Sequence, residues 1–244
     1  MTRGQIQSFN LKPGRRIGRS YEVEDRLGGG SEGEVYRIRE KSTGILRAAK
    51  LFFPHYDPKG TMPARRAQKL EALRDCPIVM QYYHTEHVRV GGLATTVMIS
   101  AYSPGQPLQA WVDRHRGKRL RPFIALTILH RLALGLEDVH DRGEYHADVH
   151  SENILIRQVG VDFQLKLIDF YDWGRPSHAK QQNDILQAVR VLYDMIGGAK
   201  GYKESPSDIR EVCCGLRHDL ILRRYPTMSA LRYHLESFEP TILP

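Results

Sequence analysis

The chain has 244 residues, of which 41% are hydrophobic and 26% charged, a composition typical of a globular protein with one domain or two joined lobes. This composition excludes a disordered chain, and no apolar run approaches the roughly 20 residues that cross a bilayer. The first ten residues lack the apolar stretch of a secretory signal. The formal charge of +8 favours acidic partners such as nucleotides, phosphorylated substrates or anionic lipids, but charge alone does not choose among them.

The three cysteines, Cys76, Cys213 and Cys214, are odd in number and lack the spacing of a metal-binding pair. Reduced thiols are the rule in the cytosol, so we expect a cytoplasmic protein. An organellar transit peptide stays open as an alternative, because the residues before Glu22 include basic but no acidic side chains. No motif in the chain indicates a nucleic-acid partner.

The first part of the chain is predicted to be rich in strands. Short β-branched and apolar runs, broken by glycine or by turn residues, predict twisted antiparallel strands within four ranges: 21–39, 44–53, 79–90 and 94–102. A helix is expected between the second and third of these, from Pro63 to about Asp75, because proline suits a first helical turn. Helical spacing puts Ala67, Leu70 and Leu73 on the buried face of that helix.

A glycine-rich turn and a lysine strand follow each other in this first part. Gly28, Gly30, Gly33 and Val35 belong to the run G-G-G-S-E-G-E-V between two predicted strands. Glycine lets backbone N–H groups approach phosphate oxygens, although such a turn alone also serves as a plain hairpin. Lys50 comes after one more turn, in R-A-A-K, and a lysine within a buried strand is costly unless it is paired. The cost of burying a lysine therefore indicates a functional role for Lys50, and the turn before it is of a kind that can approach phosphate groups.

The second part of the chain is predicted to be helical. Residues 103–105, Ser-Pro-Gly, are turn formers that we interpret as an interlobe hinge. Helical spacing predicts five helices after it: 108–114, 122–140, 181–196, 206–219 and 227–237. In the longest of these, Ile124, Ile128 and Leu132 are expected to form the buried stripe.

Strands before the hinge and helices after it predict an α+β fold with two lobes. We divide the chain into a basic N-terminal extension, an N-terminal lobe, a C-terminal lobe and a tail: 1–19, 20–102, 103–238 and 239–244.

The strongest motif lies in the C-terminal lobe. Residues 145–156 read Y-H-A-D-V-H-S-E-N-I-L-I, and residues 167–170 read L-I-D-F. Asp148 can accept a hydroxyl proton, while Asn153 and Asp169 offer oxygen ligands to a magnesium ion that bridges the phosphates of ATP. A purely structural loop has little reason to combine these polar residues with the apolar run at 154–156. The motif therefore predicts phosphoryl transfer.

The order His146, Asp148, Asn153, Asp169 resembles the catalytic and metal-binding loops of the protein-kinase superfamily. The glycine-rich turn and the A-x-K strand resemble the nucleotide-binding elements of the same superfamily, so the resemblance covers about residues 20–238. It implies a bilobal kinase fold with an antiparallel sheet and one helix in the N-terminal lobe and a mainly helical C-terminal lobe. It also implies that ATP with Mg²⁺ binds between the lobes and gives its γ-phosphoryl group to a hydroxyl.

The resemblance implies roles for further residues. Lys50 would contact the α and β phosphates, and the small Ala48 would leave room for adenine. The backbone of Ala101 and Ser103 would meet the adenine edge, beside Ser100 at the entrance to the space behind it. His146 would be a packed, hydrogen-bonded scaffold residue, since the adjoining aspartate already acts as the base.

One expected pair departs from the family pattern. If Leu70 and Leu73 set the register of the first helix, Arg66 stands where the family carries the glutamate that pairs with Lys50. Glu71 is the nearest acid and becomes the partner if the register differs. Otherwise the pair is absent or supplied elsewhere, and an absent pair would favour a pseudokinase.

The catalytic segment departs as well. Ala147 replaces the arginine that captures a phosphorylated activation loop in regulated protein kinases. His150 stands where protein kinases carry lysine, a feature shared with small-molecule phosphotransferases, and could donate to the γ phosphate. The run I-D-F-Y-D-W-G-R from Ile168 resembles a run in bacterial lipopolysaccharide-core sugar kinases. Within it, Asp172 is either an extra acid near the metal or a solvated loop carboxylate.

The segment after Asp169 is short. Asp184 resembles the aspartate of the central C-lobe helix that braces the catalytic loop, yet no A-P-E sequence lies between the two. An extended peptide substrate would therefore need a different surface. We expect an ATP-dependent kinase whose acceptor is a protein serine or threonine hydroxyl. The alternatives are a sugar, lipid or other small-molecule hydroxyl kinase, and a nucleotide-binding pseudokinase that acts as a binding module.

Overall fold

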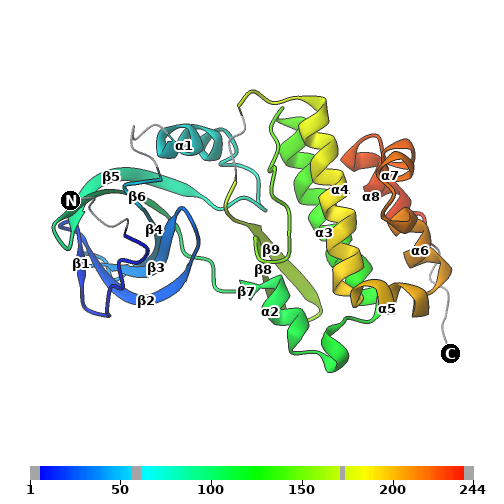
Figure 1. Cartoon of the computed structure of the whole chain (residues 1–244), viewed down its shortest axis with the longest axis horizontal. Helices are drawn as coiled ribbons and strands as arrows, with labels where there is room; N and C mark the ends of the chain where they lie inside the picture. Colours follow the sequence, from blue (N-terminus) through cyan, green and yellow to red (C-terminus); the bar gives the residue numbers. More distant parts are fainter. Residues whose placement is uncertain (1–5, 57–61, 171–173, 239–244) are drawn as a thin grey trace. The chain divides into compact units, whose positions relative to one another are not determined.

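The computed structural model describes residues 6–56, 62–170 and 174–238. The chain divides into two compact units, the first made of residues 1–74 and 80–103, the second of residues 75–79 and 104–244. The boundary after Ser103 falls within the predicted hinge. The first unit is mainly β-sheet and the second mainly helical, as Figure 1 shows, so the predicted α+β class is confirmed.

The first unit is built on one antiparallel sheet with the strand order β1-β2-β3-β4-β6-β5. Its strands are β1 (Arg16–Ile17), β2 (Tyr21–Gly29), β3 (Gly33–Glu40), β4 (Leu46–Phe52), β5 (Tyr82–Val90) and β6 (Leu93–Ala101). Alternate side chains of these strands point into one hydrophobic core. The core includes Ile17, Tyr36, Ile38, Leu51 and Ile99, all fully buried.

Helix α1 (Met62–Ala72) packs beside strand β5 in the first unit (Figure 1). Proline occupies its first turn, and Ala67, Leu70 and Leu73 are buried as predicted. The same helix also buries Arg66, which is only 4% exposed. A buried guanidinium requires a partner, and that partner lies in the glycine-rich turn described below.

Residues 8–17, within the stretch set apart as a basic extension, lie against the sheet. Strand β1 pairs with β2, and the carboxylate of Glu34 accepts hydrogen bonds from Ser8 Oγ at 2.9 Å and from the backbone nitrogen of Phe9 at 2.7 Å. Leu11 N donates to the hydroxyl of Tyr36 at 3.2 Å. This stretch is therefore part of the first unit's structure.

The second unit packs helices around α3 and α4, with a small sheet of order β7-β8-β9 on one side. Its helices are α2 (Leu108–Asp113), α3 (Pro122–Asp141), α4 (His178–Met195), α5 (Gly198–Glu204), α6 (Ser207–Cys213), α7 (His218–Arg224) and α8 (Met228–Glu236). Its strands are β7 (Gln106–Pro107), β8 (Ile154–Val159) and β9 (Asp162–Leu167). Short 3-10 turns cover Arg116–Lys118 and Cys214–Leu216.

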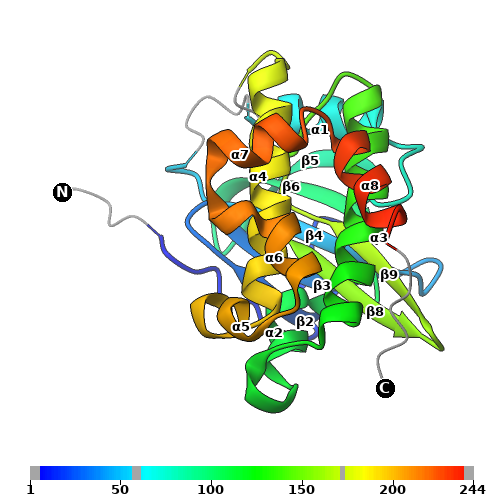
Figure 2. The ribbon, with the colours of Figure 1, turned by 90° about the vertical axis from the view of Figure 1, so that its right-hand side faces the viewer.

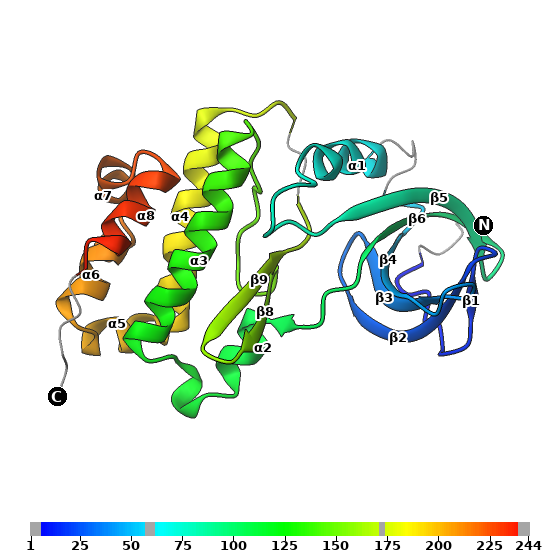
Figure 3. The same ribbon diagram turned by 180° about the vertical axis from the view of Figure 1, so that it is seen from behind.

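Helices α3 and α4 lie side by side in the core of this unit, as Figures 1 and 3 both show. Helix α8 packs on α3, while α6 and α7 pack on α4 (Figure 2). The predicted stripe of α3 is buried at Ile128 and Leu132, whereas Ile124 is only half-buried.

The helix expected at 206–219 is interrupted. Cys214 and Leu216 have φ angles of 47° and 58°, the left-handed region, which ends α6 and makes α7 start afresh at His218. Helical spacing does not reveal such a break, because the residues on both sides of it are apolar at helical intervals. Helix α5 was not predicted either.

All three cysteines are free thiols, with Cys76 and Cys213 buried. Among the helices in the described part of the chain, none combines the length and the apolarity needed to cross a membrane.

Candidate active site

Lys50 lies in the centre of strand β4, opposite the half-buried Val35 of β3 and opposite Met98 of β6. Its ammonium donates to Glu32 Oε2 at 2.8 Å. Glu71 instead pairs with Arg74 at 2.9 Å on the exposed side of α1. Of the alternatives left open by the sequence, Glu71 as the partner of Lys50 is therefore wrong, and the partner is supplied elsewhere. The carboxylate is supplied by the glycine-rich turn.

Arg66 binds the same carboxylate from helix α1. Its two terminal nitrogens donate to Glu32 Oε2 at 2.8 Å and to Oε1 at 3.0 Å, and the hydroxyl of Tyr56 donates to Oε1 at 2.9 Å. Burial alone would raise the pKa of Glu32, but hydrogen bonds and charges from Arg66 and Lys50 outweigh it and hold the pKa at about 2. The carboxylate is therefore ionised at neutral pH, which a buried acid achieves only when it is paired.

The glycines of the turn differ in the space available for a side chain. A Cβ added to Gly33 would lie 1.9 Å from the carbonyl oxygen of Leu51, so the close approach of β3 to β4 requires glycine there. A Cβ at Gly28 or Gly30 would meet no atom of the described residues within 4 Å. The described residues do not fill this space, which fits a phosphate group that approaches the backbone from outside.

The residues expected around adenine lie at the end of β6 and opposite it on β4. Ala48 is in register with Ser100, and Ala101 follows directly. The backbone nitrogen of Ala101 donates to the carbonyl oxygen of Gln81 at 2.8 Å, so its carbonyl is the group that could meet an adenine edge. Ser103 is half-buried at the end of the first unit.

In the second unit, Asp148 and Asn153 lie together. The amide nitrogen of Asn153 donates to the carbonyl oxygen of Asp148 at 3.0 Å and to its carboxylate Oδ2 at 2.9 Å. The backbone nitrogen of Ile168 donates to the carbonyl oxygen of Asn153 at 3.0 Å. This bond joins the candidate catalytic loop, residues 146–153, to Ile168, the residue that precedes Asp169.

A buried aspartate on helix α4 holds the catalytic loop in place. Asp184 is fully buried and accepts hydrogen bonds from the backbone nitrogens of His146 at 2.7 Å and of Ala147 at 2.8 Å. Its Oδ2 also lies 3.0 Å from His140 Nε2. The bracing role that the resemblance implied for Asp184 is therefore present in the structure.

His146 is fully buried, and both of its ring nitrogens are engaged. Nε2 lies 2.9 Å from the carbonyl oxygen of Ile168, while the backbone N–H of Asp148 donates to Nδ1 at 3.2 Å. These partners require a proton on Nε2 and none on Nδ1, so the ring is neutral. Its ring also contacts that of Phe170, with centroids 4.3 Å apart. His146 is thus a scaffold residue, as predicted.

The backbone of the loop is strained at two points. Ala147 has a φ of 76° and Asp169 a φ of 56°, values that residues other than glycine rarely adopt. Strained residues persist where the surroundings over-determine them, and they concentrate at functional sites. At Ala147 the bond to Asp184 is one such constraint.

His150 lies at the open side of the loop. Its Nε2 is 3.3 Å from Asp148 Oδ2, with 47% of the histidine side chain and 35% of the aspartate side chain exposed. The pair is an ion pair only when the histidine is protonated. Its exposure leaves both groups accessible to a substrate.

The oxygen groups of this loop fit magnesium. Because the amide nitrogen of Asn153 donates to Asp148, its amide oxygen is the atom that can ligate a cation, and Asp169 adds a carboxylate. The described residues contain no cluster of three or more histidine, cysteine or acidic side chains that could hold a metal alone. Magnesium suits such a sparse site, since it keeps water ligands and takes oxygens from the substrate phosphates. Asp172, the candidate extra acid, lies outside the described residues.

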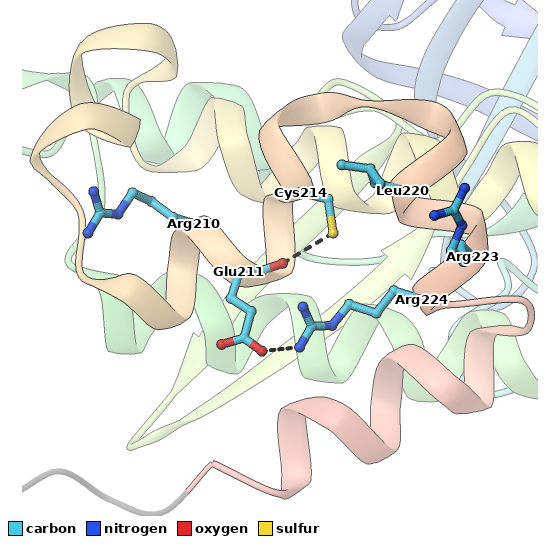
Figure 4. Close-up of a pocket in the computed structure, with 6 residues that line it drawn as sticks. All are labelled: Arg210, Glu211, Cys214, Leu220, Arg223 and Arg224. Atoms are coloured by element: carbon cyan, nitrogen blue, oxygen red, sulfur yellow. Dashed lines mark hydrogen bonds and ion pairs between the residues drawn. The ribbon is translucent and has the colours of Figure 1, made fainter.

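A separate pocket of about 410 Å³ lies between α6 and α7 in the second unit (Figure 4). Its lining residues are Arg210, Glu211, Cys214, Leu220, Arg223 and Arg224. Glu211 pairs with Arg224, while Arg210 and Arg223 extend in opposite directions away from that pair. The three guanidinium groups do not converge, and none of the predicted site residues lines the pocket.

Comparison with known proteins identifies the family. The sequence model described as "Protein kinase domain" matches residues 21–195. The chain belongs to the protein kinase family. It is 28% identical over 154 residues to human Myosin-IIIa, a match that covers 62% of this chain and 9% of that protein. It is 30% identical over 176 residues to the serine/threonine-protein kinase PkaA of Streptomyces coelicolor, covering 64% of this chain and 30% of PkaA.

The chain therefore spans a minor part of these relatives. Among solved structures, two forms of the Mycobacterium tuberculosis PknI kinase domain match with TM-scores of 0.66 and 0.63 at 17% identity. These matches cover 93% of this chain and 97% and 98% of the PknI chains. At this identity the likeness shows the fold alone, and it confirms the predicted kinase fold.

Sequence reasoning missed Glu32. The signal was the arginine at the place expected for a glutamate, Arg66, together with an acidic residue at a variable position of the glycine-rich turn, Glu32. Considered together, the two opposite charges predict an ion pair between the turn and the helix.

Proposed function

We propose that this kinase domain transfers the γ-phosphoryl group of ATP to a serine or threonine hydroxyl of a protein. The observation that carries the proposal is the hydrogen-bonded pair of Asp148 and Asn153, held by the buried Asp184. It supplies a carboxylate and a cation-binding amide in a fixed loop, the groups that phosphoryl transfer needs. The serine/threonine kinases among the relatives support the choice of acceptor.

Residues of the first unit bind the nucleotide in this proposal. Lys50 contacts the α and β phosphates, and the backbone at Gly28, Gly30 and Gly33 covers them. Ala48 and Val35 contact the adenine ring, while the backbone of Ala101 and Ser103 meets its edge. The space that the described residues leave beside Gly28 and Gly30 supports this assignment.

In the transfer step, Asp148 accepts the proton of the attacking hydroxyl, and His150 donates to the γ phosphate. Asn153 and Asp169 hold magnesium, which when bound neutralises the phosphate charge. Asn153 also orients Asp148 through its amide nitrogen, because the two hydrogen bonds fix the carboxylate relative to the loop backbone. Catalysis then comes mainly from positioning and charge neutralisation.

The test is the variant Asp148→Asn in the full chain, assayed for magnesium-dependent phosphate transfer and for ATP binding. Removing a general base lowers turnover by roughly 10²- to 10⁴-fold, whereas ATP affinity is expected to stay near that of the wild type. Asp162→Asn is the matched control, because Asp162 pairs with Arg131 on the surface of the same unit. Wild-type turnover in Asp148→Asn would remove Asp148 as the base. ATP binding without turnover in the wild-type protein would favour the pseudokinase.

A small-molecule hydroxyl is a second candidate acceptor, favoured by the short segment after Asp169. Helix α4 begins at His178, so residues 170–177 alone connect the metal-binding aspartate to it. A segment of this length leaves little chain for a platform that positions an extended peptide. Transfer of radiolabelled phosphate into the protein fraction or into the small-molecule fraction of a cell extract separates the two acceptors.

A further inference from the structure

The charged partners of Lys50 lie on other elements than the family pattern predicts. Helix α1 presents a cation, Arg66, and the glycine-rich turn supplies the anion, Glu32. Both cations donate to the same oxygen, Glu32 Oε2, each at 2.8 Å. Glu32 is therefore the shared counter-ion of one lysine and one arginine.

The ion pair between Glu32 and Arg66 is buried within the first unit. Glu32 is 5% exposed and Arg66 is 4% exposed, and two parallel hydrogen bonds join them. Arg66 also lies 5.6 Å from the centre of the Phe52 ring. Separating the two would break both of these charged hydrogen bonds within a buried environment, which is strongly unfavourable. Glu32 therefore stays with Arg66 when phosphates approach Lys50, and does not act as a stand-in for a phosphate group.

We propose that Glu32 is the positioning residue of Lys50 and that Arg66 in turn positions Glu32. This inference rests on the proposed function, because a fixed ammonium matters for activity only if Lys50 meets the phosphates of ATP. The carboxylate of Glu32 holds the ammonium end of the Lys50 side chain, while strand β4 holds its backbone end.

The arrangement also links the lysine to the glycine-rich turn. Glu32 lies between Gly30 and Gly33, and its carbonyl oxygen accepts a hydrogen bond from the backbone nitrogen of Phe53 at 2.8 Å. The backbone of the turn is thus tied to the end of β4, and its side chain to α1. A change in the position of the turn therefore changes the position of the lysine.

The first variant is Glu32→Gln, which removes the charge and keeps the shape. We expect kcat/KM for ATP to fall roughly 10- to 100-fold, the range that corresponds to losing a hydrogen bond to a charged group. ATP affinity, measured directly by calorimetry with MgATP, is expected to fall as well. The melting temperature of each variant is recorded so that binding is compared among folded proteins.

Glu34→Gln is the matched control. Glu34 is 2% exposed, two residues from Glu32, and it also carries several hydrogen bonds. Its partners are Tyr36, Arg26 and the N-terminal residues rather than Lys50. We expect this variant to lose stability while its ATP affinity and kcat/KM stay within about twofold of the wild type, because it leaves the support of Lys50 intact.

A pair of double variants tests positioning independently of the stability of Glu32→Gln. Glu32→Gln with Arg66→Met removes both charges, an exchange that buried ion pairs often tolerate. Glu32→Gln with Arg66→Glu moves the carboxylate from the turn to position 66 of α1, whose side chain shares the Glu32 contact with Lys50. We expect the second double variant to exceed the first by about tenfold in kcat/KM for ATP, because a carboxylate again faces the lysine.

The outcomes are distinct. If the wild-type protein neither binds nor turns over MgATP, the proposed function fails. If the wild type is active and Glu32→Gln keeps its ATP affinity and kcat/KM, the role of Glu32 is overturned. A Glu32→Gln variant that binds ATP more tightly would also overturn it, since Glu32 would then compete with phosphate. Rescue by the relocated carboxylate supports it.

Discussion

A buried carboxylate organises each of the two units, but the two act on different groups. In the second unit, Asp184 accepts from backbone nitrogens of the catalytic loop, whose positions are fixed by the chain itself. In the first unit, Glu32 accepts from the ends of two long cationic side chains. Substitutions can place a cationic or acidic side chain on one element or on its neighbour. A backbone nitrogen, in contrast, stays where the chain places it, whatever the side chain. This difference explains why the bracing aspartate, Asp184, follows the family pattern while the carboxylate partner of Lys50 comes from a different element.

The largest expected loss of stability follows from removing the carboxylate of Asp184. Asp184→Ala leaves the nitrogens of His146 and Ala147 buried without an acceptor, which costs about 4 kcal/mol at the usual 1–3 kcal/mol for each unsatisfied group. The free energy of unfolding, measured in urea, is the test. Asp184→Asn is the control, because its amide oxygen still accepts one of the two bonds and we expect it to lose about half as much. A loss below about 1 kcal/mol in Asp184→Ala would contradict the bracing role.

The next largest loss of stability is expected from substitutions in the turn that carries Glu32. Gly33→Ala forces a Cβ against the Leu51 carbonyl and is expected to cost about 3 kcal/mol of stability, at the upper end for overpacking. Gly28→Ala meets no described atom within 4 Å, so its stability is expected to stay within about 1 kcal/mol of the wild type. Its ATP affinity is expected to fall about tenfold, since the new methyl group takes space assigned to phosphate. Equal stability losses in the two variants would refute this division of roles.

The dependence of stability on pH sharpens the comparison further. The pKa of Glu32 in the folded protein is about 2, below its ordinary value of 4.5, so its contribution is fully present above pH 4.5 and is lost as the pH falls toward 2. Between about pH 5 and pH 3, the wild type should lose roughly 2 kcal/mol more stability than Glu32→Gln. Urea unfolding of both proteins at the two pH values measures this difference. Parallel pH profiles would show that Arg66 and Lys50 do not stabilise the charged form.

The smallest effect is expected at the open side of the catalytic loop. The pair of His150 with Asp148 is partly exposed, so His150→Ala should change stability by less than about 0.5 kcal/mol. Turnover is expected to fall by up to about tenfold through the loss of one donor to the γ phosphate. The exposed His218, at the start of α7, provides the control His218→Ala with unchanged turnover. A fall beyond about 100-fold would mean that His150 does more than donate a hydrogen bond.

The two units also differ in how far their sites could be predicted from sequence. Asp148 and Asn153 are five residues apart, and a short loop brings them into contact whatever the rest of the chain does. The brace from Asp184 is distant in sequence, but the family pattern carries it. The contact between Asp148 and Asn153 could therefore be predicted from their spacing, and the brace from the family pattern.

The pairing of Lys50 was not predictable in the same way. Glu32 and Arg66 are 34 residues apart, and their contact depends on where α1 packs against the sheet. The apolar periodicity correctly assigned the buried face of α1 through Leu70 and Leu73. Periodicity does not predict the ion pair of an arginine on that face, because it scores only apolar residues as buried. The break at Cys214 escaped prediction for a related reason, since a left-handed residue leaves the apolar spacing around it unchanged.

The contacts of Glu34 bear on where the chain can be truncated. A fragment that starts at Tyr21, where the family match begins, would discard Ser8, Phe9 and Asn10, which all donate to this carboxylate. Glu34, a carboxylate on strand β3 that is 2% exposed, would then keep Arg26 and Tyr36 as donors but lose the three donors of the N-terminal stretch. A shortened protein intended for nucleotide binding should therefore keep the residues from Ser8 onward, even though they precede the recognised family region.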